Sequence, residues 1–359
     1  MSAFLKACFI AVPLLVAMPA TAATTGNTLG LPTDYKNTPT HKLKYDDLDL
    51  FLGQTVLKTG RSNHKVARKP QAITGTRVAY DNTKPSRLEG NRVLFHQQTT
   101  ELVRVSAELR DTMLGIADKV DFATLSKDEQ LAYWLNLHNI IVYNELAQMY
   151  PVTDLSPVMA NCAKKTSIYC SRRYELADQM VSLQDIRDHV VQNWDDPLVI
   201  YGFYLGAVGT PNVRGGAFSG DSVWQDLREN AVDFIHSVRG SRNRSKKSLS
   251  VSEYYEHFPK FFPNFEADIL AHVRDHAESY YLPQLGKIKT VKANLSDWNI
   301  ADLYNGHLKD PTGAGNVVRQ DPRSRQQNNA VPLHARRLLA DIQRRNKARE
   351  EALATKASS

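Results

Sequence analysis

The chain has 359 residues, of which 42% are hydrophobic and 9% aromatic, and it carries a formal net charge of +7 at pH 7. These values exclude a chain too short or too polar to bury a core, and they fit one large domain or two small ones. The sequence shows no internal repeat of the period that solenoid proteins have.

The first 22 residues have the pattern of a signal peptide. An apolar run from Ala7 to Met18 follows Lys6, and Ala20-Thr21-Ala22 supplies a small-x-small cleavage site. The run is too short to span a bilayer permanently, although an N-terminal anchor helix is the alternative. We therefore expect a mature protein that is periplasmic or secreted, followed by a flexible N-terminus over residues 23–42. No later segment has 18 consecutive apolar residues, so no transmembrane span is expected.

Two cysteines remain after the predicted signal peptide, Cys162 and Cys170 in "NCAKKTSIYC". In an exported chain this spacing favours one short disulfide loop. The alternative is a nucleophilic thiolate, because neighbouring cations such as Lys164 and Arg172 would lower a thiol pKa.

Helical patterns dominate residues 43–305, the predicted globular domain. Apolar side chains recur at spacings of three and four, and capping boxes begin at Ser126 and Ser182. The predicted helices are residues 45–60, about 98–118, 126–146, 182–194, 221–240 and 264–277. Residues 195–211 are predicted to form a buried strand and a turn, and residues 247–262 a strand with a loop. The fold class is therefore α+β, a helix-rich single domain with a small sheet.

Residues 306–359 form a predicted disordered basic tail. A basic helix over residues 331–354 is one interpretation of its end, with cations that can contact an anionic surface, namely Arg336, Arg337, Arg344 and Arg345. A solvated surface helix is the other. Because the chain is predicted to be exported, we expect no nucleic-acid partner.

The stretch "LAYWLNLHNIIVYNEL", residues 131–146, is apolar around its whole circumference. It therefore predicts a central buried helix that carries Asn136, His138 and Asn139 inside the domain. Buried amides need hydrogen-bond partners, so the two asparagines either fix neighbouring loops or bind a ligand. His138 is either a core imidazole or a general base. Glu145 lies two turns away, too far for direct acid–base pairing with it.

No H-x-x-x-H or H-E-x-x-H spacing occurs, and neither G-x-S-x-G nor a glycine-rich phosphate loop is present. The sequence therefore gives no support to zinc, serine-hydrolase or nucleotide-dependent classes. We expect no metal site and no other cofactor.

Three segments in order, "LAYWLNLHNIIVYNEL", "VSLQDIRDHVV" and "DDPLVIYGFYLGAVGTPNVRG", resemble the domain-of-unknown-function family number 547 over about residues 85–240. The resemblance marks Trp134, Asn136, Asn139, Ser182, Ile186, Asp196, Pro197, Pro211 and Arg214. It also implies cysteines in many members where this chain has Leu205 and Thr210, and a tyrosine where it has His138. A distantly papain-like fold is one interpretation of such a turn cysteine, which this chain lacks.

Two functions follow from these patterns, and whether any reaction is catalysed stays open. The first is a non-catalytic binding or scaffolding domain of the cell envelope, in which Asn136, Asn139 and Arg214 bind a ligand. Its partner would be an envelope protein or an anionic surface. The alternative is a thiol-dependent hydrolase or transferase acting on envelope peptide material. Its candidate catalytic residues are Cys162 or Cys170 as nucleophile and His138 or His189 as base.

Overall fold

The structure is a computed structural model, which describes residues 39–64, 66, 85–86, 89–160, 162–163, 167–303 and 306. The predicted signal peptide, most of the predicted N-terminal segment and the basic tail beyond residue 306 lie outside the described residues. Within them, no helix is long and apolar enough to cross a membrane.

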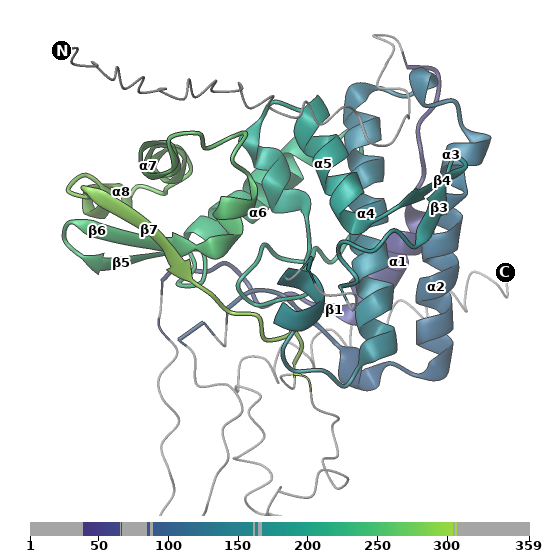
Figure 1. Ribbon diagram of the computed structural model, residues 1–359, viewed down its shortest axis with the longest axis horizontal. Helices are drawn as coiled ribbons and strands as arrows, with labels where there is room; N and C mark the ends of the chain where they lie inside the picture. The colour runs from purple at the N-terminus through teal and green to yellow at the C-terminus, as the bar shows by residue number, and fades with distance from the viewer. Residues whose placement is uncertain are drawn as a thin grey trace, which may run out of the picture.

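One long helix, α4 (Lys127–Met149), runs through the helical part of the molecule (Figure 1). It packs against α2 (Thr100–Leu114), α5 (Leu183–Asn193) and α6 (Val223–Ile235). Nearly every residue from Glu129 to Leu146 is buried, so the predicted central buried helix is confirmed. The Ser126 hydroxyl caps this helix by accepting a hydrogen bond from the Glu129 amide at 3.1 Å. The Glu129 carboxylate does not return the bond as a capping box requires, and instead accepts the Leu43 amide.

The remaining helices are short and surround this body. They are the α-helices α1 (Asp46–Thr55), α3 (Ile116–Lys119), α7 (Phe265–Asp275) and α8 (Leu282–Leu285), the 3-10 helices η1 (Phe95–Gln97), η2 (Phe122–Thr124), η4 (Pro197–Gly202) and η5 (Glu253–His257), and a π-helical turn, η3 (Ser156–Ala160). The helix predicted to reach Gly60 ends at Thr55, because the chain there enters a strand. The capping box predicted at Ser182 is confirmed, with both reciprocal bonds between Ser182 and Asp185 present.

Strands are few and short. Two antiparallel pairs join β1 (Val56–Leu57) to β2 (Arg92–Val93) and β3 (Tyr174–Leu176) to β4 (Gln179–Val181). A three-stranded sheet joins β5 (Ser241–Ser245) antiparallel to β6 (Ser248–Ser252), which pairs in parallel with β7 (Thr290–Leu295). This sheet lies with α7 and α8 at the end of the molecule away from α2 (Figure 1). The helix-rich α+β class with small sheets is therefore confirmed.

The prediction of a buried strand within residues 195–211 is wrong, because the structure has no strand there. Residues 197–202 form η4, and an irregular segment follows. The Asp196 carboxylate accepts the Leu198 amide at 2.8 Å, and Pro197 occupies the first helical position, where its missing N–H costs nothing. The apolar run Leu198–Gly202 is buried on all sides, and a short run of this kind has no period that separates helix from strand. With no strand here, the suggested papain-like arrangement has no support.

The last described segment returns to the helical body from β7. Asn299 bridges to Asp154, Ile300 to Ala207 and Asp302 to Val93. Ile300 is fully buried. Residues 297–302 therefore tie together three parts of the chain that are far apart in sequence.

Candidate functional site

The Asn136 side chain holds a distant loop against the centre of α4. Its Nδ2 donates to the Phe218 carbonyl at 2.8 Å, and its Oδ1 accepts the Phe218 amide at 2.9 Å. One side chain thus satisfies both backbone groups of a residue 82 positions away, in a site where only 3% of Asn136 is exposed. An unpaired amide there would cost free energy, so this contact fixes the loop.

The Asn139 side chain holds the backbone at the end of η4 against α4 in the same way. Its Nδ2 donates to the Gly202 carbonyl at 2.8 Å, and its Oδ1 accepts the Tyr204 amide at 2.9 Å. The backbone can approach this closely because Gly202 lacks a side chain, and a Cβ there would lie 2.6 Å from Leu135 Cδ2. The two asparagines of α4 therefore clamp the segment that carries the family-like motif.

His138 is a fully buried imidazole beside this clamp. Its Nδ1 lies 3.0 Å from Asn139 Oδ1, and its ring packs edge-on to Phe203 at 5.0 Å. Because Oδ1 is an acceptor, the ring carries its proton on Nδ1, and Nε2 is an acceptor with no hydrogen-bond partner among the described residues. Burial lowers the pKa of His138 to about 4, so the ring is neutral at pH 7.

His189 lies on α5 and packs on Trp134 with ring centroids 4.5 Å apart. Burial lowers its pKa to about 4 as well. In the described part of the chain, no hydrogen bond or ring contact joins His189 to His138 or to a cysteine. The two histidines predicted as alternative bases are thus separate core residues and form no shared site.

Cys162 and Cys170 form a disulfide with their Cα atoms 5.4 Å apart, as predicted. The loop that it closes approaches α4 through Tyr169, whose ring centroid lies 6.1 Å from that of His138. A cysteine in a disulfide has no thiol with which to attack a substrate.

Arg214 is paired with an acidic side chain. Its Nη1 forms an ion pair with Asp226 of α6, and its guanidinium lies 5.0 Å from the Phe218 ring centroid. Its side chain is 22% exposed and that of Asp226 is 11% exposed, so the charge is largely compensated inside the molecule. Arg214 and Asn136 therefore meet at Phe218, whereas Asn139 and His138 meet at η4.

Thr210 stands where the family resemblance implies a cysteine, and it is buried. Its hydroxyl donates to the Ala207 carbonyl at 2.8 Å, which closes the turn on itself. Behind the turn, Arg239 donates to the carbonyls of Val208 and Thr210. Only 4% of Arg239 is exposed, so this cation is a buried support of the turn.

Arg239 belongs to a buried charge cluster that the sequence analysis missed. Its Nη2 also donates to Asn212 Oδ1 at 2.8 Å and to Asp233 Oδ2 at 3.2 Å. Glu89 accepts the Val238 amide at 3.0 Å, and burial raises the pKa of its carboxyl to about 7. Perturbed buried carboxyls mark functional sites and structural ion networks alike. No local pattern could have found this cluster, because Glu89 and Arg239 lie 150 positions apart.

Gly90 shows how tightly this cluster is packed. Its φ is +76°, in the region that favours glycine, and a Cβ there would lie 2.8 Å from Asn212 Oδ1 and 2.9 Å from Arg239 Cζ. The glycine thus lets the chain pass directly over the guanidinium.

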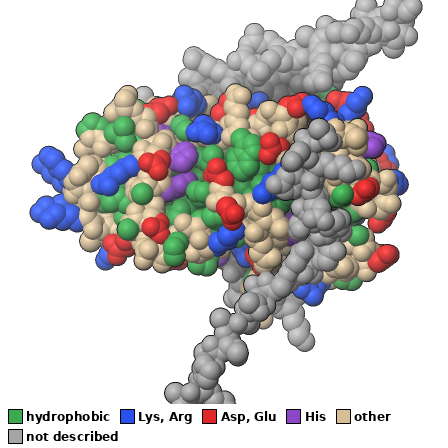
Figure 2. Space-filling view, turned by 90° about the horizontal axis from the view of Figure 1, so that it is seen from above, with side chains coloured by type: hydrophobic (Ala, Val, Ile, Leu, Met, Phe, Trp, Pro, Cys, Tyr) green, Lys and Arg blue, Asp and Glu red, His purple; other side chains and the backbone are tan. Residues whose placement is uncertain are grey.

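A second feature that the sequence analysis missed is on the surface. Lysine and arginine side chains gather at the end of the molecule that carries β5 and β6 (Figure 2). They come from "RNRSKK", residues 242–247, and "KIKTVK", residues 287–292, and neither segment contains an acidic residue. The run of cations in each segment is visible in the sequence, but the approach of the two segments to each other is not.

Among the described residues, no group of three or more His, Cys, Asp or Glu side chains is placed to hold a metal ion. The ligand-binding prediction for Asn136, Asn139 and Arg214 stays a prediction, as does the catalytic prediction for His138, His189 and the cysteines.

The fold and these contacts define a helix-rich α+β domain built around one buried helix that carries several polar side chains. Residues 122–235 match the model of the family described as "Protein of unknown function, DUF547". The match spans η2 to α6 and confirms the resemblance drawn from the motifs. No curated protein and no solved structure matches the chain.

Proposed function

We propose that this chain is an exported, non-catalytic binding or scaffolding domain. The observation that carries the proposal is the use made of the polar side chains on α4. Asn136 and Asn139 each satisfy a backbone amide and a backbone carbonyl of the segment 202–218. Side chains engaged in this way stabilise a fold, and breaking these bonds to receive a substrate would leave buried groups unpaired.

The thiol-dependent alternative has less support. It needs a free cysteine beside a base, whereas the disulfide between Cys162 and Cys170 leaves no thiol. A buried neutral imidazole such as His138 is also poorly placed to exchange protons with a ligand in solvent. Arg214, the predicted anion receptor, is matched by Asp226.

Export and the kind of partner are further parts of the proposal. The pattern of residues 1–22 and a disulfide in a chain with three cysteines both favour an oxidising compartment. The cationic end formed around β5 and β6 supports an anionic partner surface.

The test is a thiol count on protein purified from the exported fraction, under denaturing conditions, with and without prior reduction. We expect no free thiol before reduction and two after it, together with an N-terminus near Ala23 by mass spectrometry. Cys162→Ser is the control, since it should expose one free thiol in the unreduced sample. Two thiols in the unreduced native protein, one of them reacting unusually fast at neutral pH, would overturn the proposal in favour of a thiol enzyme.

A further inference from the structure

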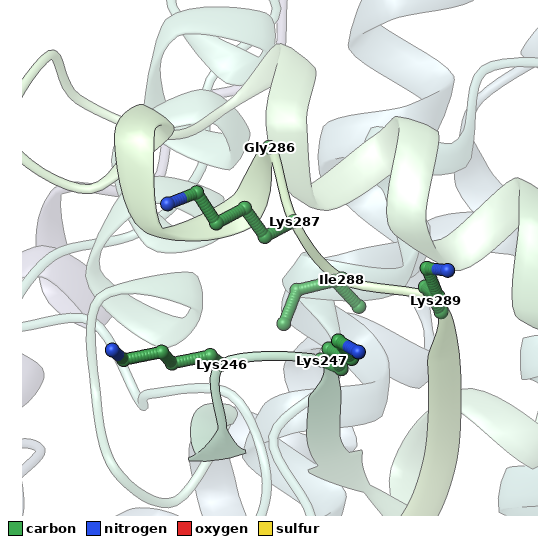
Figure 3. Close-up of a pocket in the computed structure, with 6 residues that line it drawn as sticks. All are labelled: Lys246, Lys247, Gly286, Lys287, Ile288 and Lys289. Atoms are coloured by element: carbon green, nitrogen blue, oxygen red, sulfur yellow. The ribbon is translucent and has the colours of Figure 1, made fainter.

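A hollow of about 400 Å³ lies at the cationic end of the molecule (Figure 3). We call it the lysine hollow, and it is lined by Lys246, Lys247, Gly286, Lys287, Ile288 and Lys289. Lys246 and Lys287 extend to one side of it, and Lys247 and Lys289 to the other. Four lysines therefore flank one small opening.

The backbone fixes the spacing of these lysines. The amides of Lys289 and Thr290 both donate to the Lys247 carbonyl, at 2.9 and 3.2 Å, where β7 begins beside β6. Ile288 is only 6% exposed and forms an apolar floor. The sheet thus fixes the backbone positions from which the lysine side chains extend at the rim of the hollow.

The lysines of the hollow differ from other surface lysines in their pairing. None of the four lysines forms an ion pair with a carboxylate in the part of the chain that the structure describes, in contrast to Lys42, which pairs with Asp221. Glu266 is the carboxylate that reaches this sheet from α7, and its Oε2 accepts the Val291 amide at 3.0 Å.

Further cationic side chains lie across the sheet. Arg242, Ser250 and Lys292 are paired across β5, β6 and β7, so their side chains share one face. Arg244 adds a third cationic position on the outer strand. A row of like charges repels itself and favours a ligand with several negative charges.

Exposed apolar side chains lie close to this charge in the chain. Tyr280 is 45% exposed and Leu282 is 42% exposed, and α8 connects them directly to Gly286. Lysines beside an exposed leucine and an aromatic ring are the combination found on surfaces that lie in a membrane interface. A soluble anion would need the lysines but not these apolar side chains.

We propose that the lysine hollow docks the protein on a lipid bilayer by receiving the phosphate of an anionic headgroup. The neighbouring cations contact further headgroups, and Leu282 enters the interface. This inference rests on the proposed function, since it names the anionic partner surface of the binding domain.

The test is sedimentation of the mature full chain with vesicles of phosphatidylcholine alone or with about 30% phosphatidylglycerol. We expect binding only to the anionic vesicles and a steep loss as sodium chloride rises, because salt screens the attraction. Replacing all four lysines of the hollow by glutamine should weaken binding about 100-fold or more. Leu282→Ala should weaken it roughly five-fold.

The matched control removes four exposed lysines elsewhere, Lys42, Lys44, Lys58 and Lys119, and should bind like the unmodified chain within about three-fold. Both variants keep the tail beyond residue 306, so any contribution from its arginines is the same in each. Equal loss in both variants, or no binding by a chain with an unchanged circular dichroism spectrum, would overturn the inference.

Inositol hexakisphosphate serves as the soluble phosphate probe. Binding of this probe without binding to anionic vesicles would assign the hollow to a soluble polyanion and overturn bilayer docking. Each of these outcomes leaves the thiol count unaffected, so failure of the docking inference is distinct from failure of the proposed function.

Discussion

The two ends of the molecule use polar residues in opposite ways. Around α4 the polar side chains are buried and bonded to the backbone, as Asn136 and Asn139 show. Around β5–β7, exposed lysines such as Lys246 and Lys287 face solvent. The comparison teaches that the asparagines marked by the sequence motifs are bonded to backbone groups inside the fold, whereas the lysines around the hollow lie outside the family-matching segment.

The largest effect should be the pH dependence of stability that His138 contributes in the helical body. Burial lowers the pKa of His138 to about 4, from about 6.5 in an unfolded chain. The folded state therefore binds fewer protons, so the contribution is fully present above pH 6.5 and is lost as the pH falls towards 4. Integrated over that window it amounts to about 3 kcal/mol.

His138→Gln should remove this part of the acid sensitivity. Between pH 7.5 and pH 4 the unfolding free energy of the variant should fall by about 3 kcal/mol less than that of the unmodified chain. Urea unfolding at the two pH values measures it, with His41→Gln at an exposed position as the control. An identical pH dependence in all three proteins would show that His138 titrates normally in the fold.

Asn136→Ala should lower the unfolding free energy by about 2 kcal/mol, because it leaves the Phe218 amide and carbonyl buried without partners. Asn264→Ala is the control, since Asn264 precedes α7 at an exposed position and its side chain makes no capping bond. That variant should change stability by less than about 0.5 kcal/mol. A melting curve unchanged by Asn136→Ala would favour the ligand-binding role for this residue instead.

The smallest effect should come from the lysine hollow. Replacing its four lysines by glutamine should change the unfolding free energy by less than about 0.5 kcal/mol, and at low salt the sign should be stabilising because like charges are removed. Thermal melts at about 20 and 500 mM sodium chloride test this. A loss above about 1 kcal/mol would mean that the hollow, like α4, is part of the packing.

Much of the helical body was predictable because its signals are local. The apolar circumference of residues 131–146 predicted a buried helix, and Ser182 with Asp185 predicted where α5 begins. The capping box predicted at Ser126 has only one of its two bonds, since the Glu129 carboxylate accepts the Leu43 amide instead. Local patterns place helix ends well and their individual bonds less well.

The features that the sequence did not predict depend on contacts between residues far apart in the chain. The segment after Pro197 carries strand-forming residues, but packing on α6 and the Asp196 cap fold it as η4. The cluster of Glu89 with Arg239 brings together residues from opposite parts of the sequence, and the lysine hollow exists only because β7 returns to pair with β6. None of these contacts follows from a spacing of residues that can be recognised in the sequence.

The bridges made by residues 299–302 also bear on how the protein is synthesised. Ile300 pairs with Ala207 and Asp302 with Val93, so the helical body is complete only when about 300 residues have left the ribosome. The family-matching segment 122–235 emerges long before its last neighbours do. During that interval the segment lacks the neighbours that residues 299–302 supply, so the last steps of folding must wait for the C-terminal part of the described chain.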